Sequence, residues 1–297
     1  MIDVPSAFAA DTIAREGASG EAWIRSLPGR VDALCRRWGL RRIGRPLHGY
    51  LGIVVPVQRA DTRFALKVSW IDEYSYQEAV ALRAWGGHGA VALEDADEDE
   101  GALLLEWLDP GRSLVDVAEG EAVIRAGELL RRLAIPAPAE LRTLGVEVAS
   151  LIEALRRRVT TGASGIPTEW VDWAAAWTRD APMDAPTLVN QDLHYENVLA
   201  GRREPWLVID PKPLRGVLEF GVAPLLWNRM DSMGSAFDLE RRLARICAAG
   251  ALDHARARGW SAVRLIEAAV WAREQADADF AGRCRTLVTW LFDAGMP

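Results

Sequence analysis

Cysteine and histidine are scarce in this sequence, and their spacing excludes two kinds of site. The three cysteines, Cys35, Cys247 and Cys284, lie far apart and form no Cys-x-x-Cys pair. Neither a disulfide framework nor a zinc site is therefore indicated, and we expect the three side chains to be buried as small apolar groups. The four histidines also lack the spacing of metal ligands.

Long apolar runs and clusters of basic residues are missing too. No stretch approaches the roughly 20 apolar residues that cross a bilayer, and the first residues lack a basic leader followed by an apolar block. The formal net charge is -7 and the sequence pI is about 5.3. We therefore expect a cytoplasmic protein that binds neither membrane nor nucleic acid. The electrostatic field of a negatively charged protein favours a small cationic substrate. The sequence gives no evidence of an obligate protein partner.

The chain is otherwise ordinary in composition, with 297 residues, 50% hydrophobic and 26% charged, which is enough for a large core or two lobes. Runs rich in Val, Ile and Leu predict strands at residues 52–59, 63–70, 90–93 and 102–107. Apolar periodicity predicts helices at residues 21–40, with a break near Pro28, and at 72–85, 120–133, 146–160 and 167–179. Helical periodicity resumes at residue 223, with breaks expected at 259–260 and 281–282. The sequence thus predicts an α+β fold with two lobes, a small antiparallel-sheet lobe over residues 1–107 and a larger, mostly helical lobe over residues 108–297.

Three polar residues, Asp192, Asn197 and Asp210, follow two short apolar runs, residues 187–189 and 206–209. If these runs are the adjacent strands of a small hairpin, the three side chains emerge side by side at the strand ends. The spacing is that of the catalytic and metal-binding loops of kinases, in which an Asp accepts or orients the attacking hydroxyl and an Asn and a second Asp hold Mg²⁺. The alternative is two ordinary polar turns.

The first third of the chain contains the groups that would bind a nucleotide. Lys67 stands at the centre of a predicted strand, where a buried charge needs a partner, and Glu78 on the following helix is the candidate. In kinases such a Lys contacts the α and β phosphates of ATP and the Glu fixes it; the alternative is an edge-strand Lys and an unrelated surface Glu. Gly49 and Gly52 are candidates for a phosphate-covering loop. Residues 103–108, which include Glu106, Trp107 and Leu108, would form a hinge whose backbone groups contact adenine; the alternative is an ordinary strand that leads to a connector.

With these residues in place, the chain resembles the aminoglycoside phosphotransferase family, which has a protein-kinase-like fold. More narrowly, it is similar to the streptomycin 6-kinase and hydroxyurea phosphotransferase branch. The resemblance rests on three segments, Asp-Leu-His-Tyr-Glu-Asn-Val-Leu-Ala, Arg-Glu-Pro-Trp-Leu-Val-Ile-Asp-Pro-Lys-Pro-Leu and Ala-Pro-Leu-Leu-Trp-Asn. It implies ATP- and Mg²⁺-dependent O-phosphorylation of a small polar antibiotic, which prevents the drug from binding its target. Streptomycin or a related aminoglycoside is the expected acceptor.

The sequence departs from this pattern around the catalytic Asp. Asn190 stands where the family usually has His, and Val217 and Gly221 replace aspartates. Because such residues support the catalytic loop, their replacement predicts a competent but slower or looser catalyst. Hydroxyurea or a metabolite alcohol as acceptor, or a nucleotide-binding regulatory protein without transfer activity, are the alternative functions.

Carboxylates and aromatic residues after Trp227 are candidates for binding a cationic substrate. Asp231, Glu274, Asp277 and Asp279 are selected by location, and Trp227 and Trp271 could form a wall of the pocket. The alternative is that the acids form a solvated helix face and that the two tryptophans belong to the core.

Overall fold

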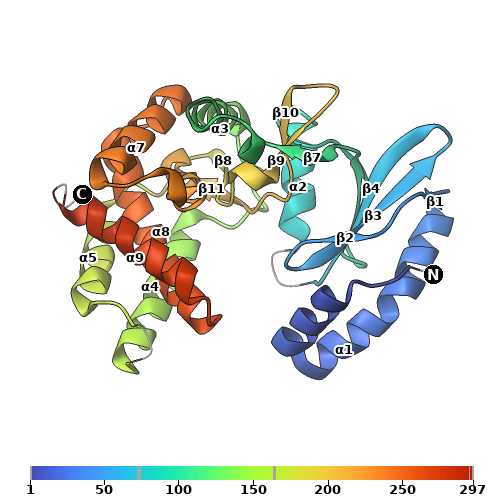
Figure 1. The fold of residues 1–297 in the computed structure, drawn as a ribbon, viewed down its shortest axis with the longest axis horizontal. Helices are drawn as coiled ribbons and strands as arrows, with labels where there is room; N and C mark the ends of the chain where they lie inside the picture. The colour runs from blue at the N-terminus through green and yellow to red at the C-terminus, as the bar shows by residue number, and fades with distance from the viewer. Residues whose placement is uncertain (1, 72–74, 163–164, 294, 296–297) are drawn as a thin grey trace. The chain divides into compact units, whose positions relative to one another are not determined.

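The computed structural model describes residues 2–71, 75–162, 165–293 and 295. The chain forms two compact units (Figure 1). Unit 1 comprises the chain up to Asp109 together with Gly201–Pro205, and unit 2 comprises Pro110–Ala200 and the chain from Trp206 onward.

The α-helices in the described ranges are α1 Ser6–Arg37, α2 Ser75–Trp85, α3 Glu119–Leu133, α4 Leu144–Thr160, α5 Thr168–Asp180, α6 Pro224–Trp227, α7 Ala236–Gly250, α8 His254–Glu274 and α9 Ala278–Asp293. The strands are β1 Arg41–Arg42, β2 Leu47–His48, β3 Gly52–Arg59, β4 Thr62–Ser69, β5 Leu93–Asp97, β6 Ala102–Glu106, β7 Asp109–Ser113, β8 Thr187–Asn190, β9 Val198–Ala200, β10 Trp206–Val208 and β11 Pro213–Gly216. Short 3₁₀ helices are η1 Leu114–Asp116, η2 Tyr195–Asn197, η3 Leu218–Gly221 and η4 Met230–Ser232. No helix in the part of the chain that the structure describes is long and apolar enough to span a bilayer.

An antiparallel sheet covered by α1 forms the core of unit 1. The strand order is β1-β3-β4-β6-β5, and β2 pairs with the first half of β3, away from the residues that pair with β1. Helix α1 lies along the sheet (Figure 1). Its apolar side chains, among them Leu27 and Val31, form one buried cluster with Ile53, Leu66 and other residues of the sheet. Because side chains alternate along a strand, Lys67 points to the face opposite α1.

Two expectations for the first third are wrong in detail. Pro28 does not break the first helix: α1 continues through it, and the non-helical residue is Gly17, with φ 63° and ψ -138°. The buried residues that follow Pro28 on the sheet side stabilise the helix by more than the roughly 3 kcal/mol that an internal proline costs. The strand expected at residues 90–93 instead begins at Leu93 and extends into the acidic segment, as β5 Leu93–Asp97.

Helices make up most of unit 2, and the breaks expected at two glycines are absent. Gly259 lies inside α8 and Gly282 inside α9. A side chain at Gly259 would collide with the Trp177 ring, because its Cβ would lie 2.1 Å from Trp177 Cζ2. Gly259 therefore marks a close approach of α5 to α8, and Trp260 beside it is fully buried. The chain breaks fall between these helices instead, where Ala251 and Ala276 have positive φ.

The three cysteines are buried and free, as expected. Burial raises the pKa of the Cys247 and Cys284 thiols to about 12, and it also raises the pKa of Cys35. The thiols therefore stay protonated at neutral pH and behave as small apolar groups.

Candidate active site

The strands around Asp192 and Asp210 pair in a different way from the one expected. Strands β8 and β10 do not pair with each other: β8 pairs with β11, and β9 pairs with β10. These four short strands thus form two antiparallel pairs, called ribbons here, and the β9-β10 ribbon lies between β8 and β11 in the sequence. Strand β9 also pairs with β7, which makes a three-stranded sheet of order β10-β9-β7. The predicted single hairpin is wrong, but the nested ribbons still bring the polar residues to adjacent strand ends.

The register of the two ribbons explains which residues meet. Asn190, the last residue of β8, pairs with Pro213, the first of β11, so Asp192 lies next to Lys212. Val198 pairs with Val208, which brings Asn197 beside the segment that leads to Asp210. The Ile209 N-H donates to Asn197 O at 2.9 Å, and this hydrogen bond continues the β9-β10 pairing at the end where Asn197 lies.

The Asn190 side chain joins the turn that contains Asp192 to the turn that contains Lys212. Its side-chain oxygen accepts the Asp192 N-H and the Lys212 N-H, each at 3.1 Å, and its side chain is almost completely buried. The Gln191 N-H donates to Lys212 O at 3.0 Å. The Asn190 side chain therefore fixes the turn that contains Asp192, the candidate catalytic turn, by direct hydrogen bonds.

The side chains of the two turns are partly open to solvent. The Lys212 ammonium lies 2.8 Å from Asp192 Oδ2, with the Lys212 side chain 61% exposed and the Asp192 side chain 20% exposed. The Asn197 amide nitrogen donates to Asp192 O at 3.5 Å. Asp210 is exposed and has φ 49°, a left-handed conformation that few non-glycine residues adopt. Such backbone strain is commonly kept where a side chain must point in one direction for function.

Tyr195 anchors the turn between Asp192 and Asn197. Its hydroxyl donates to Leu225 O at 3.2 Å, and burial raises the pKa of Tyr195 to about 12. The phenol therefore remains a hydrogen-bond donor at neutral pH and ties η2 to α6.

The replacement at Gly221 also has a structural reason. A Cβ at this position would lie 2.6 Å from Asn190 O and about 3.4 Å from a Leu130 methyl group. Gly221 therefore lets the end of β8 pack closely against η3, and the space where an Asp side chain would begin is filled. Val217, the other replaced position, is buried at the start of η3.

Unit 1 brings Lys67 and Glu78 together. The Lys67 ammonium lies 2.6 Å from Glu78 Oε2, and each side chain is 13% exposed. Gly52 is a buried β3 residue opposite Ser69, and a Cβ there would lie 2.7 Å from both Ser69 Oγ and Val68 O. Close strand packing thus explains Gly52 without a ligand, whereas a Cβ at Gly49 would meet open space.

The residues expected to contact adenine are partly occupied by contacts within unit 1. The Glu106 N-H donates to Ala92 O at 2.9 Å, and its carboxylate pairs with Arg203 at 2.9 Å. Arg203 also donates to Ala90 O, which holds Gly201–Pro205 in this unit. Trp107 is half-buried and Leu108 is buried.

The candidate substrate residues are spread over several elements. Asp231 is exposed on η4, and Asp277 and Asp279 are exposed around the start of α9. Glu274, at the end of α8, pairs with Arg158 of α4 at 2.7 Å and raises the pKa of that guanidinium. Trp271 is 43% exposed, and Trp227 packs edge-on against Phe280.

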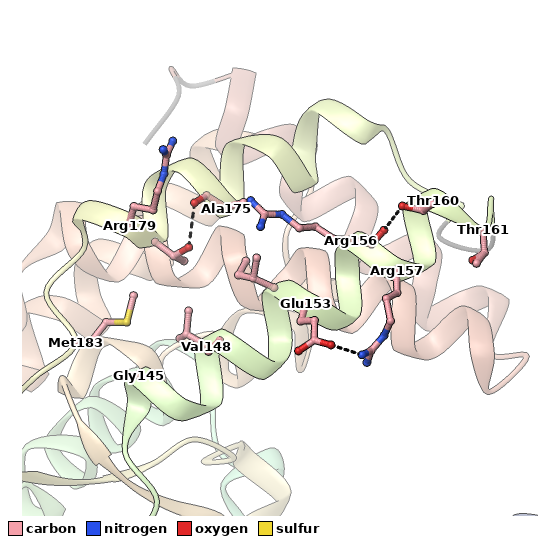
Figure 2. A pocket seen from close by; sticks show the side chains of 13 residues that line it. Gly145, Val148, Glu153, Arg156, Arg157, Thr160, Thr161, Ala175, Arg179 and Met183 are labelled. Atoms are coloured by element: carbon pink, nitrogen blue, oxygen red, sulfur yellow. Dashed lines mark hydrogen bonds and ion pairs between the residues drawn. The ribbon is translucent and has the colours of Figure 1, made fainter.

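A groove of about 700 Å³ runs between α4 and α5 (Figure 2). Val148 and Ile152 contribute an apolar floor, and Arg156 and Arg179 stand at its rim. None of the residues predicted for catalysis or nucleotide binding lines it, so size alone does not identify the reaction site.

Asn190→Leu should lower turnover by about 10- to 100-fold, because the catalytic turn loses the acceptor that fixes two N-H groups while side-chain volume is kept. Loss of these bonds should also lower the free energy of unfolding by about 1 to 3 kcal/mol. Steady-state kinetics and urea unfolding measure the two effects. Thr187→Val at the start of the same strand is the control, and equal turnover in the two variants would contradict the role of Asn190.

Gly221→Ala should destabilise the protein by about 1 to 3 kcal/mol, since the new methyl group collides with backbone that is fixed by strand pairing. Gly282→Ala is the matched control: a Cβ there meets no atom within 4 Å, and alanine in a helix interior is favourable by up to about 1 kcal/mol. Urea unfolding should show opposite shifts of the midpoint, and a neutral Gly221→Ala would show that η3 can move away from β8.

Solved structures with a similar fold define the fold class. Aminoglycoside phosphotransferase APH(4)-Ia, in a ternary complex with ADP and hygromycin B, matches with a TM-score of 0.62 and 17% identity over 90% of this chain and 98% of that one. A choline/ethanolamine kinase family protein from Mesorhizobium loti matches with a TM-score of 0.58 and 17% identity, over 89% and 98% of the two chains. The fold is therefore protein-kinase-like, as the sequence predicts.

Sequence relatives give the family. A hydroxyurea phosphotransferase from Kitasatospora aureofaciens is 40% identical over 288 residues, 93% of this chain and 82% of that protein. A streptomycin 6-kinase from Streptomyces glaucescens is 37% identical over 286 residues, 94% and 93% of the two chains. The family model described as aminoglycoside/hydroxyurea antibiotic resistance kinase matches residues 37–276, and the chain belongs to that family. It is an enzyme of the kinase class.

Lys212 is the residue of this site that the sequence motifs alone did not single out. It lies inside the Asp-Pro-Lys-Pro segment. The pairing of β8 with β11 places it beside Asp192, and this pairing could not be predicted from the short apolar runs of the sequence.

Proposed function

We propose that the protein is an ATP- and Mg²⁺-dependent O-phosphotransferase that acts on streptomycin or a related cationic aminoglycoside. The observation that supports this most strongly is the meeting of Asp192 and Asn197 with the Asp210 segment at adjacent ends of two ribbons in one unit. Phosphoryl transfer depends mainly on positioning and charge neutralisation, so these few groups suffice.

Asp192 is the proposed proton acceptor. Lys212 lies against Oδ2 of its carboxylate. An acceptor hydroxyl hydrogen-bonded to this carboxylate would be aligned for attack and would give up its proton as the new P-O bond forms. Partial burial and the hydrogen bonds of Asn190 keep the carboxylate in one place.

Asn197 and Asp210 fit Mg²⁺ in the kind and number of their oxygens. The Asn197 amide nitrogen faces Asp192 O, so its side-chain oxygen is the atom that can face a cation. Among the residues that the structure describes, no group of three or more His, Cys, Asp or Glu could hold a metal ion. A sparse site completed by phosphate oxygens and water is the form that Mg²⁺ takes in kinases. When bound, the ion would neutralise charge on the phosphate oxygens.

The nucleotide groups of unit 1 are proposed from the Lys67-Glu78 pair. In kinases a strand Lys held by a helix Glu contacts the α and β phosphates of ATP, and the Lys67-Glu78 pair has this arrangement. Gly49 and the backbone of Glu106, Trp107 and Leu108 remain candidates for contacts to the phosphates and adenine. An ATP-dependent reaction also suits the cytoplasmic location that the sequence indicates.

The acceptor is proposed from the sequence relatives and the acidic charge of the chain. A polycationic aminoglycoside is attracted by a protein with a net charge of -7. Asp231 is exposed and stays a candidate contact, while the Glu274 carboxylate already pairs with Arg158. Hydroxyurea is the second candidate, because a hydroxyurea phosphotransferase is among the relatives at 40% identity.

One incubation distinguishes these functions. The purified protein is mixed with Mg²⁺, ATP and, separately, streptomycin, hygromycin B or hydroxyurea, and each acceptor is examined by mass spectrometry for one added phosphoryl group. We expect phosphorylated streptomycin. Product from hydroxyurea alone would establish the second candidate, and nucleotide binding with no product from any acceptor would favour a regulatory protein.

A further inference from the structure

Lysine is rare in this chain and occurs where the chemistry is proposed. Of the 35 basic residues, two are lysines, Lys67 and Lys212, and all others are arginines. Each lysine pairs with a carboxylate, Lys67 with Glu78 and Lys212 with Asp192. A lysine ammonium is a compact cation with three N-H donors, whereas the arginine guanidinium is a larger, planar cation whose N-H donors have fixed directions. The two positions therefore share a compact cation that has more than one N-H donor.

The backbone of Lys212 is held firmly, and its side chain is largely exposed to solvent. Its N-H donates to Asn190 Oδ1 and its carbonyl accepts from the Gln191 N-H, so both polar groups are bonded to the catalytic turn. The flanking Pro211 and Pro213 are buried, and proline fixes its own backbone φ. The side chain, at 61% exposure, gains little stability from its ion pair with Asp192. The fold thus places an ammonium group next to the proposed proton acceptor.

We propose that Lys212 is a further catalytic residue, whose ammonium group contacts the transferring phosphoryl group beside Asp192. This inference rests on the proposed function. The acceptor hydroxyl bonded to Asp192 attacks the γ-phosphorus, so a group 2.8 Å from Asp192 Oδ2 reaches the equatorial oxygens of that phosphorus. Negative charge is spread over these oxygens in the transition state, and a fixed cation there stabilises it. With three N-H donors, Lys212 can keep one bond to Asp192 while it donates to a phosphoryl oxygen.

Labelling with an acyl phosphate of ATP, which carries its acyl group on the γ-phosphate, tests this contact directly. An amine near the γ-phosphate attacks the acyl carbon, an amide forms, ATP leaves and the amine loses a proton. Because the chain has two lysines, peptide mass spectrometry assigns the label without ambiguity. We expect acylation of Lys212 that excess Mg²⁺ and ATP prevent. Label on Lys67 alone, with the same protection, would overturn the Lys212 contact and leave nucleotide binding intact; no protected label on either lysine would reject both proposals.

Kinetics of variants provide the second test. Lys212→Ala should lower kcat by about 10² to 10³-fold and leave the KM for ATP within about threefold, because the lost interaction belongs mainly to the transition state. Lys212→Arg should recover part of kcat, since it restores the charge but not the compact shape. Arg125→Ala, which removes an exposed positive charge from α3, is the matched control and should keep full turnover. Wild-type kcat in Lys212→Ala, or reduced kcat without ATP-protected labelling of Lys212 in the parent protein, would overturn the proposal.

Discussion

Replacing Asp192 by Asn should lower turnover by about 10² to 10⁴-fold while nucleotide affinity stays nearly unchanged. The amide has the size of the carboxylate but cannot accept the proton of the acceptor hydroxyl. The Asn190 bond to the Asp192 N-H involves backbone and survives the change, so the turn should keep its shape. Single-turnover kinetics with streptomycin and a separate nucleotide-binding titration measure the two quantities.

Glu196→Gln is the matched control for this prediction. Glu196 belongs to the same short 3₁₀ helix as Asn197 and its side chain is 68% exposed. Loss of its charge should leave turnover within a small factor of the parent value. If Asp192→Asn turned over as fast as Glu196→Gln, Asp192 would have no part in the proton transfer.

Asp210→Ala should abolish the Mg²⁺-dependent part of nucleotide binding. Residues that merely support a metal ligand commonly change affinity by about 10- to 100-fold, so removal of a ligand should cost at least about 100-fold. Titration of ATP by calorimetry with and without Mg²⁺ measures this as the ratio of the two affinities. The exposed Asp210 carboxylate is not needed for core packing, so the variant should fold, at a cost of about 1 kcal/mol because alanine tolerates the left-handed backbone less well than Asp does.

Asp172→Ala, on the exposed face of α5, separates metal binding from a general loss of negative charge. Its affinity for ATP should rise with Mg²⁺ as in the parent protein. An unchanged Mg²⁺ dependence in Asp210→Ala would reject Asp210 as a metal ligand, even if turnover fell.

The residues of the site could be predicted from sequence more securely than the strands that position them. Asp192, Asn197 and Asp210 stand at short separations along the chain, and turn positions after apolar runs are a local pattern. Which run pairs with which is a long-range choice among strands of three or four residues that are equally apolar. For this reason the single hairpin was wrong, and β8-β11 and β9-β10 emerged only in the folded chain.

The supporting residues show the same limit. The sequence identifies Asn190 and Gly221 as departures from a family pattern. It does not reveal that the two residues are in contact, so each replacement can be interpreted only by itself. In the structure they are neighbours: Gly221 leaves room for the Asn190 carbonyl, and the Asn190 side chain bonds to the turns of Asp192 and Lys212. Packing of this kind depends on atoms far apart in the chain, which no local pattern encodes.

The sequence by itself determined the fold class and the family and predicted the reactive groups, because hydrophobic periodicity and short motifs are local properties of the chain. Tertiary structure decided that α1 runs through Pro28, that α8 runs through Gly259, and that Lys212 lies against Asp192. The physical reason is the same in each case. Burial of side chains and pairing of strands outweigh local preferences, and both join residues that are distant in sequence.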